Sequence, residues 1–206
     1  PVGRVWGLTL FECIRITLDK DGRLCLLSAK EHIERLNEKA QEMLLPTVDV
    51  DEVMLALKEL ANLERGLVTE DSFLVARMCL SADDTAVSKK NITDTEFTIL
   101  LEYRKVTAPP SLRVSVSEDC PVTKLVQGTA YTSMCARLGW ARAKKREYDE
   151  TLWLDSVYGK YFLGFGSKTL FVRIGDSVVC PDSDDVMTRC VISLMQSWGI
   201  DCQVRS

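Results

Sequence analysis

The fold of this chain is decided by the stretch Ser28-Ala29-Lys30-Glu31-His32-Ile33-Glu34-Arg35-Leu36. A serine followed three residues later by a glutamate is typical of a capping box, in which the two residues cap each other's backbone N–H groups. Apolar residues then recur at helical spacing at Ile33, Leu36 and Ala40, and Pro46 would end the helix. The stretch therefore predicts an amphipathic helix that begins near Ser28.

Outward from this helix, alternating and helical patterns predict a first α+β half. A second helix is expected at 51–63, and the expected strands are 5–18, 23–27, 72–80 and 96–104. The stretch Thr107-Ala108-Pro109-Pro110-Ser111 is the best candidate linker, because consecutive prolines interrupt regular structure.

A second α+β half is expected beyond the linker. Helices are predicted at 131–146 and 185–198, and strands at 112–117, 151–155, 161–163 and 169–174. The last helix would be capped by Asp184 or Asp185 and ended by Gly199. The chain is thus expected to divide into residues 1–106, a linker at 107–111, and residues 112–206.

The composition is that of a soluble globular protein. The 206 residues are 46% hydrophobic and 27% charged, and no apolar run approaches the ~20 residues that a membrane span needs. The net charge of -4 disfavours nucleic acid as a partner. The basic run Arg142-Ala143-Lys144-Lys145-Arg146 is the local exception, and a solvated helix face explains such a run more often than an RNA site does.

The numbers and spacing of cysteine and histidine limit which metal sites and which redox compartment are expected. The eight cysteines form no C-x-x-C pair, so buried thiols in a reducing intracellular compartment are expected. The single histidine, His32, makes a zinc site improbable, and no metal site is expected. The first residues lack the order of a secretory signal. Because the chain begins at Pro1 rather than at a methionine, we expect it to be either processed or a fragment. A mitochondrial or other organelle matrix is compatible with it.

Four segments resemble motifs of one enzyme family. They are Gly7-Leu8-Thr9-Leu10-Phe11-Glu12-Cys13-Ile14-Arg15, similar to a G-x-x-x-F-E-x-x-R strand; His32-Ile33-Glu34-Arg35-Leu36 with Ala40, similar to an H-x-x-R-L helix; Tyr148-Asp149-Glu150-Thr151-Leu152-Trp153-Leu154-Asp155, similar to a G-Y-D-E-x-L-x-L-D strand; and Ser197-Trp198-Gly199-Ile200 with Val204, similar to a final helix and strand. Their order and spacing resemble the class IV aminotransferases, the family of branched-chain and D-amino-acid aminotransferases and aminodeoxychorismate lyase.

The resemblance implies an α+β fold with a small N-terminal domain and a larger C-terminal domain. It stops early in the family's C-terminal section, so we expect a shortened second domain. In active members, pyridoxal phosphate (PLP) lies between the domains and the enzymes are usually homodimers, which makes a homodimer an expectation here.

The family's Schiff-base lysine has no clear counterpart. Alignment from Tyr131, which matches the family's tyrosine, puts Val126 at the lysine position, whereas alignment back from Asp155 points nearer Thr129. Neither side chain can form an imine. Lys124 lies two residues from Val126, the nearer of the two aligned positions, and is the only candidate for the missing lysine. A shift of even one residue on a strand turns a side chain to the other face.

The groups that would hold the cofactor ring and phosphate also depart from the family. Leu163 stands at the position of the glutamate that pairs with the pyridinium nitrogen, and Thr169 replaces an asparagine. Ser28 occupies the position of the arginine that binds the cofactor phosphate in the family. The stretch 184–189 keeps Thr188 and Arg189 of a P-G-I-T-R loop, but it places two aspartates where the phosphate would bind. We therefore expect no PLP, with Tyr131, Thr188 and Arg189 as residual cleft candidates.

Structural roles are expected for the remaining polar residues of these motifs. Glu12 is predicted to be an exposed acid on a strand, His32 a histidine on the helix surface or near the helix cap, and Arg35 a partner in a structural ion pair. Apolar side chains at Phe162, Leu163 and Phe165 would suit a packing or docking surface.

Three functions follow as hypotheses. The first is a catalytically inactive structural or interaction subunit of a larger assembly, with protein partners. The second is a PLP-dependent, branched-chain type aminotransferase that uses Lys124. The third is an RNA-associated subunit that binds through the 142–146 run, which the acidic overall charge disfavours.

Overall fold

The computed structural model describes residues 8–82, 92, 94–107, 111–117, 130–155, 158–165, 168–183 and 185–205, with the backbone alone at 130–133 and 135. The chain divides into two compact units, the first holding residues up to 108 and the second holding most of the rest. Both mix helices and strands, as the α+β pattern predicted. Among the described helices, none has the length and apolarity to cross a membrane.

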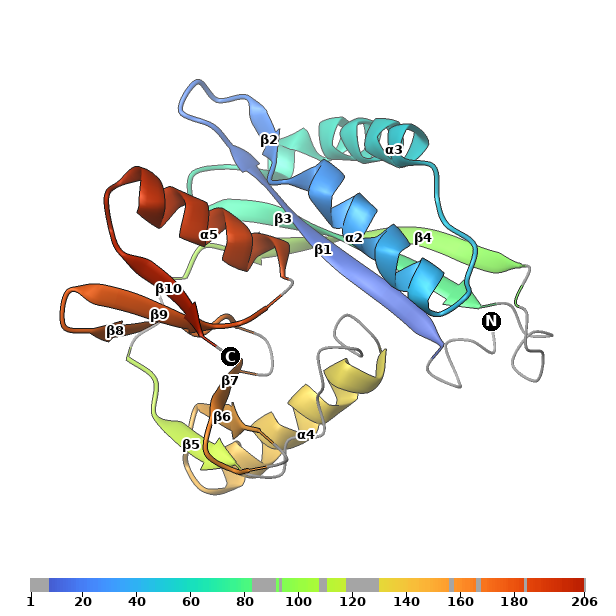
Figure 1. Ribbon diagram of the computed structural model, residues 1–206. Coiled ribbons are helices and arrows are strands. Elements are labelled where there is room, and N and C mark those ends of the chain that lie inside the picture. Colours follow the sequence, from blue (N-terminus) through green and yellow to red (C-terminus); the bar gives the residue numbers. More distant parts are fainter. Residues whose placement is uncertain are drawn as a thin grey trace. The chain divides into compact units, whose positions relative to one another are not determined.

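The first unit is a four-stranded antiparallel sheet with two helices on one face (Figure 1). The strand order is β2-β1-β3-β4. Its elements are β1 (Thr9–Leu18), β2 (Leu24–Leu26), α2 (Ala29–Glu42), α3 (Val50–Leu63), the short 3-10 helix η1 (Arg65–Leu67), β3 (Ser72–Ala82) and β4 (Thr95–Lys105). Each predicted element of this half is present, with bounds that differ by a few residues.

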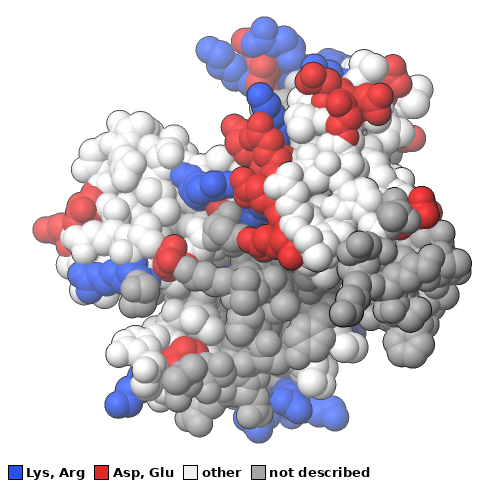
Figure 2. Space-filling view, turned by 45° about the vertical axis from the view of Figure 1, so that its right-hand side comes forward, with Lys and Arg blue, Asp and Glu red and all other residues white. Residues whose placement is uncertain are grey.

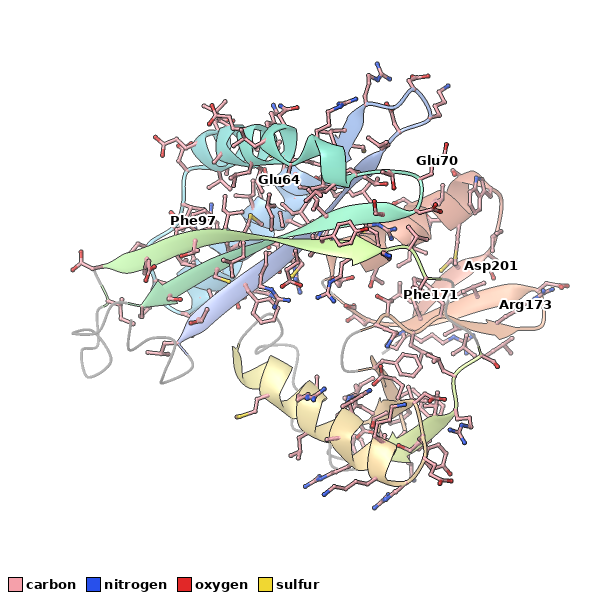
Figure 3. All side chains as sticks on the ribbon, turned by 180° about the vertical axis from the view of Figure 1, so that it is seen from behind. Glu64, Glu70, Phe97, Phe171, Arg173 and Asp201 are labelled. Carbon is pink, nitrogen blue, oxygen red and sulfur yellow. The ribbon has the colours of Figure 1, made fainter. Side chains whose placement is uncertain are left out.

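The core of this unit lies between the sheet and its helices. Alternate residues of β1, among them Leu10 and Ile14, point to the helix face and are almost fully buried. Ile33 and Leu36 of α2 meet them from the other side, which is the helical spacing seen in the sequence. Phe97 of the edge strand β4, labelled in Figure 3, packs against the same cluster.

The start of α2 differs from the predicted capping box. Ser28 is the N-cap residue, but its backbone is left-handed (φ 48°, ψ 39°) and its side chain makes no cap hydrogen bond. An N-cap side chain reaches the first-turn N–H groups from an extended backbone, which Ser28 lacks. Asp49, the N-cap of α3, has that extended backbone, and its carboxylate accepts a hydrogen bond from the Glu52 N–H at 2.9 Å.

The second unit contains two three-stranded sheets and two helices. One sheet has the order β5-β6-β7 and the other β10-β9-β8. The elements are β5 (Val114–Ser117), α4 (Ala130–Lys145), β6 (Glu150–Leu154), β7 (Phe162–Phe165), β8 (Val172–Ile174), β9 (Ser177–Pro181), α5 (Val186–Ser197) and β10 (Cys202–Arg205). Strand β9 was not predicted, and the strand expected at 169–174 is limited to β8.

Two connections shape this unit. The parallel pairing of β5 with β6 requires a crossover, and α4 lies in that crossover. A close approach seats α4 on the sheet, since the Gly139 Cα faces the indole of Trp153 in β6. Helix α5 connects β9 to β10, which pair in parallel, and Asp201 before β10 accepts a hydrogen bond from Ser177 (Figure 3).

Candidate functional site

The first polar cluster of the molecule is built around Glu12 of β1. Its carboxylate accepts a hydrogen bond from His32 Nδ1 at 2.9 Å and another from the Arg35 guanidinium, and Lys39 Nζ lies 3.5 Å from Oε1. Glu12 is 4% exposed, His32 3% and Arg35 6%. The cluster lies beneath α2, on the buried face of the sheet.

One prediction about this cluster was wrong, one was half right and one is confirmed. Glu12 is not an exposed acid. His32 is buried rather than on the helix surface, but it does lie next to the helix cap, where its backbone N–H donates to the Ser28 carbonyl oxygen at 3.1 Å. Arg35 makes a structural ion pair, as predicted. Strand alternation was the signal that sequence reasoning missed, because Glu12 shares a face with Leu10 and Ile14. With three basic partners around one carboxylate, the cluster ties α2 to β1.

The second polar cluster lies at the N-terminus of α5. Asp185 is the N-cap, and its Oδ2 accepts hydrogen bonds from the Thr188 N–H at 2.9 Å and from Thr188 Oγ1 at 3.0 Å. Thr188 is 1% exposed, and its hydroxyl also lies 3.1 Å from that of Thr169. The predicted capping by Asp185 is confirmed, and Thr169 joins Thr188 as a contact that the sequence did not show.

The electrostatics of this helix end oppose an anionic ligand. The first N–H groups of a helix carry a partial positive charge, which commonly binds phosphate. Here the Asp185 carboxylate accepts a hydrogen bond from the Thr188 N–H of the first turn, so a negative charge already lies at this helix end. Arg189, which follows Thr188 in the first turn, is exposed.

The residue at the predicted ring-nitrogen position offers no charge. Leu163 lies on β7 and is 45% exposed, with Phe162 beside it at 49%. A leucine can neither accept a proton nor hold one on a pyridinium nitrogen. Both side chains are apolar and about half exposed, and as consecutive strand residues they point to opposite faces of β7.

Other predicted site residues are not placed in detail. Lys124, Val126 and Thr129 lie outside the described residues, and so does Asp184. Tyr131 belongs to the first turn of α4, but its side chain is not among those described. Among the described side chains, no three His, Cys, Asp or Glu residues converge as a metal site would require.

A buried carboxylate in the second unit was also missed. Glu150 of β6 is 5% exposed, and its carboxylate accepts a hydrogen bond from Lys168 Nζ. The neighbouring Thr151 donates to the Gly139 carbonyl oxygen at 2.9 Å. These contacts tie β6 to α4 and to the segment after β7. The Y-D-E-x-L motif that carried the resemblance therefore contributes a structural anchor.

Comparison with known proteins places the fold. The family model of the class IV amino-transferases matches residues 9–206. The chain belongs to the class IV aminotransferase family. Solved structures agree with that fold: a branched-chain aminotransferase from Thermoproteus uzoniensis, with norvaline, superposes with a TM-score of 0.79 at 16% identity, over 97% of this chain and 69% of that one. The holo-form branched-chain aminotransferase of Thermobaculum terrenum, in PLP form, gives a TM-score of 0.77 at 16% identity, over 100% and 70%.

Sequence relatives within the class IV aminotransferases are transaminases. A branched-chain-amino-acid transaminase of Bacillus subtilis is 27% identical over 212 aligned positions, which cover 95% of this chain and 59% of the relative. A methionine aminotransferase of Arabidopsis thaliana is 24% identical, with 98% and 60% covered. The chain thus spans about three fifths of the length of these relatives.

Proposed function

We propose that this class IV aminotransferase-fold chain is catalytically inactive and acts as a structural or interaction subunit of a larger assembly. The observation that carries the proposal is the Asp185 carboxylate at the N-terminus of α5. Its Oδ2 accepts hydrogen bonds from the Thr188 N–H and hydroxyl, and its charge repels a phosphate dianion at close range.

The rest of the described site supports the same proposal. Leu163 supplies no carboxylate for the pyridinium nitrogen, and Thr188 is committed to Asp185 and Thr169. The described residues therefore do not fit PLP, and no transamination step is assigned to them. The Glu12 cluster and the apolar core, which hold the fold together, are intact.

An interaction surface is compatible with exposed side chains on and beside β7. Tyr161, Phe162 and Leu163 are 57%, 49% and 45% exposed, and they are consecutive in the chain. Neighbouring exposed apolar groups of this kind are typical of protein contact sites. A protein partner or a second copy of the chain is therefore the class of partner proposed here.

Cofactor binding is tested by spectroscopy and chemical trapping. The purified protein is mixed with excess PLP, its visible spectrum is recorded, and borohydride reduction is followed by peptide mapping. We expect no internal aldimine band and no single lysine trapped at one equivalent. The matched variants are Lys124→Ala and, as a control, Lys58→Ala on the exposed side of α3.

The alternative, a PLP-dependent aminotransferase of branched-chain type, rests on the class IV relatives and on Lys124. It requires stoichiometric trapping that Lys124→Ala abolishes and Lys58→Ala preserves, a result that would overturn the inactive assignment. The RNA-associated alternative requires salt-sensitive RNA binding through the 142–146 run.

The interaction role is tested on the full protein in its native source. Affinity purification with mass spectrometry is expected to recover a stoichiometric protein complex or a homo-oligomer. The variant Leu163→Asp should weaken that complex, and Leu55→Asp, at an exposed leucine of α3 (59% exposed), serves as the control. An inert monomer without any stoichiometric partner would contradict the proposal.

A further inference from the structure

A small crevice in the second unit lies between α4 and the edge of the β5-β6-β7 sheet. It has a volume of about 60 Å³, several times the ~10–15 Å³ that a single water requires by such a measure. Strand β5 contributes Ser115 and Ser117 to its wall, and β6 contributes Thr151 and Trp153. The paired register of the two strands, Ser115 with Thr151 and Ser117 with Trp153, sets these four side chains on one face.

Helix α4 and the residue just after it complete the crevice with two arginines. Arg142 and Arg146 both line it, and they are four residues apart, so they lie on the same side of the chain as it leaves the helix. None of the described residues that line the crevice is acidic. Figure 2 shows basic side chains along the lowest part of the view, at the level of α4.

This arrangement separates the members of the basic run. Lys144 contacts the Asp149 carboxylate at 3.2 Å, so its charge has a partner in the loop before β6. Lys145 does not line the crevice, although it is adjacent in sequence. Charge alone would make the members of the run equivalent, whereas the crevice singles out Arg142 and Arg146.

From this geometry we propose that the crevice binds a phosphate group of a small molecule, held by Arg142 and Arg146 with the hydroxyls of Ser115 and Ser117. Guanidinium groups donate paired hydrogen bonds that match phosphate oxygens, and such charge-assisted bonds are stronger than neutral ones.

Trp153 gives the crevice a built-in reporter. Its side chain is 5% exposed, and its Nε1 has no hydrogen-bond partner within the described part of the protein. Because this indole forms part of the wall, a bound anion changes the surroundings of its N–H. The proposal is independent of PLP binding at the N-terminus of α5.

The test is a titration of the full protein with inorganic phosphate, followed through the indole N–H resonance of Trp153 in a two-dimensional NMR spectrum. Saturable shifts are expected in phosphate, with potassium chloride at matched ionic strength producing none. Arg142→Ala and Arg146→Ala should each weaken phosphate binding about tenfold or more, and Ser115→Ala should weaken it less. Lys145→Ala, at the residue adjacent to Arg146, should leave the binding constant unchanged because Lys145 does not line the crevice.

Two results would overturn the proposal. The first is a phosphate response that fails to saturate or is equal in the Arg146→Ala and Lys145→Ala variants. The second comes from a parallel titration with a ten-nucleotide RNA. In that outcome the RNA binds tightly, inorganic phosphate does not bind, and Lys145→Ala reduces RNA binding as much as Arg146→Ala does. The 142–146 run would then be a nucleic-acid surface. The variants Arg142→Lys and Arg146→Lys, which keep the charge, guard against loss of folding as the explanation, and thermal unfolding confirms that each variant is folded.

Discussion

At the scale of single residues, Glu12 shows how a charged side chain becomes part of a core. It is surrounded by His32, Arg35 and Lys39, and all four side chains are buried. A buried carboxylate of this kind is tolerated because its partners compensate for the lost hydration. Removing it leaves cationic groups buried without their counter-charge.

We expect Glu12→Gln to lower the free energy of unfolding by about 3–5 kcal/mol, the range measured when one partner of a buried ion pair is removed. Urea denaturation followed by circular dichroism measures the change. The control is Glu34→Gln, whose carboxylate is exposed and lies 3.7 Å from Lys30 Nζ, and which should cost about 0.5 kcal/mol or less. Equal effects from the two substitutions would contradict a structural role for the Glu12 cluster.

The thiol of Cys13 provides a second prediction at this scale. Burial raises the pKa of Cys13, and the nearby Arg77 guanidinium only partly opposes that rise. A raised pKa means that less of the reactive thiolate is present at neutral pH. Alkylation of Cys13 in the native protein should therefore be slower than in the same chain unfolded in urea, and should approach the unfolded rate only as the pH rises above the ordinary thiol range. Peptide mapping after timed labelling measures this, and equal rates at pH 7.5 would refute it.

At the scale of elements, the packing of α4 on β6 depends on the lack of a side chain at Gly139. A Cβ built there would lie 2.3 Å from Cζ2 and 2.6 Å from Cη2 of Trp153, closer than real contacts allow. Glycine inside a helix normally costs about 1 kcal/mol relative to alanine. The close approach of the indole explains its presence in α4.

Gly139→Ala should therefore destabilise the protein by about 1–3 kcal/mol, as overpacking does, despite the gain in helix propensity. Gly66→Ala in η1 is the control, because nothing lies within 4 Å of the added carbon. It should be neutral or slightly stabilising. In the Trp153→Phe background the smaller ring should reduce the cost of Gly139→Ala, which a double-mutant cycle in urea measures.

Asp149 joins the end of α4 to the start of β5. Its carboxylate accepts hydrogen bonds from the Arg113 N–H at 3.0 Å and from Lys144 Nζ at 3.2 Å. These contacts, the backbone bond from Arg113 first, hold the pKa of Asp149 below the usual range. Because the folded pKa is lowered, the stabilisation is present above the unfolded pKa and is lost as the pH falls through the folded one.

Asp149→Asn should consequently be less stable than the native sequence at neutral pH, with the difference shrinking as the solution becomes acidic. Thermal unfolding of both proteins between neutral pH and pH 2 measures it. A difference that stays constant over this range would show that the Asp149 charge does not contribute.

At the scale of the whole molecule, the two units should respond to substitutions independently. The contacts of Glu12 with His32, Arg35 and Lys39 lie in the first unit, and the contact of Gly139 with Trp153 lies in the second. The effects of Glu12→Gln and Gly139→Ala should therefore add to within about 0.5 kcal/mol in the double variant. A larger deviation in urea denaturation would reveal energetic coupling between the units.

Much of the architecture could be predicted from the sequence, and the misses have physical causes. Helices α2, α3, α4 and α5 were found from apolar spacing, which is a local signal. Strand β9 was missed because Ser177–Pro181 is short, ends in proline and pairs with the distant β10. The burial of Glu12 was visible in strand alternation, but the acidic side chain argued against it.

The candidate site was predictable in part for the same reason. The capping of α5 by Asp185 follows from a local pattern, and it was foreseen. The hydroxyl contact between Thr169 and Thr188 was not, because it depends on how the segment after β7 packs against α5. The crevice at Arg142 and Arg146 likewise depends on the register of β5 with β6.

The Asp185 carboxylate has a consequence for the history of the chain. If the proposed function is right, a single substitution that introduced a lysine at the family's Schiff-base position would give no selective gain. The Asp185 carboxylate would still oppose binding of the cofactor phosphate. Loss of Asp185 alone would remove the helix cap and lower stability before any catalysis returned. Each single substitution toward an enzyme is then neutral or harmful by itself, so the loss of activity is hard to reverse. Descendants of this chain are more readily modified at their contact surfaces than returned to catalysis.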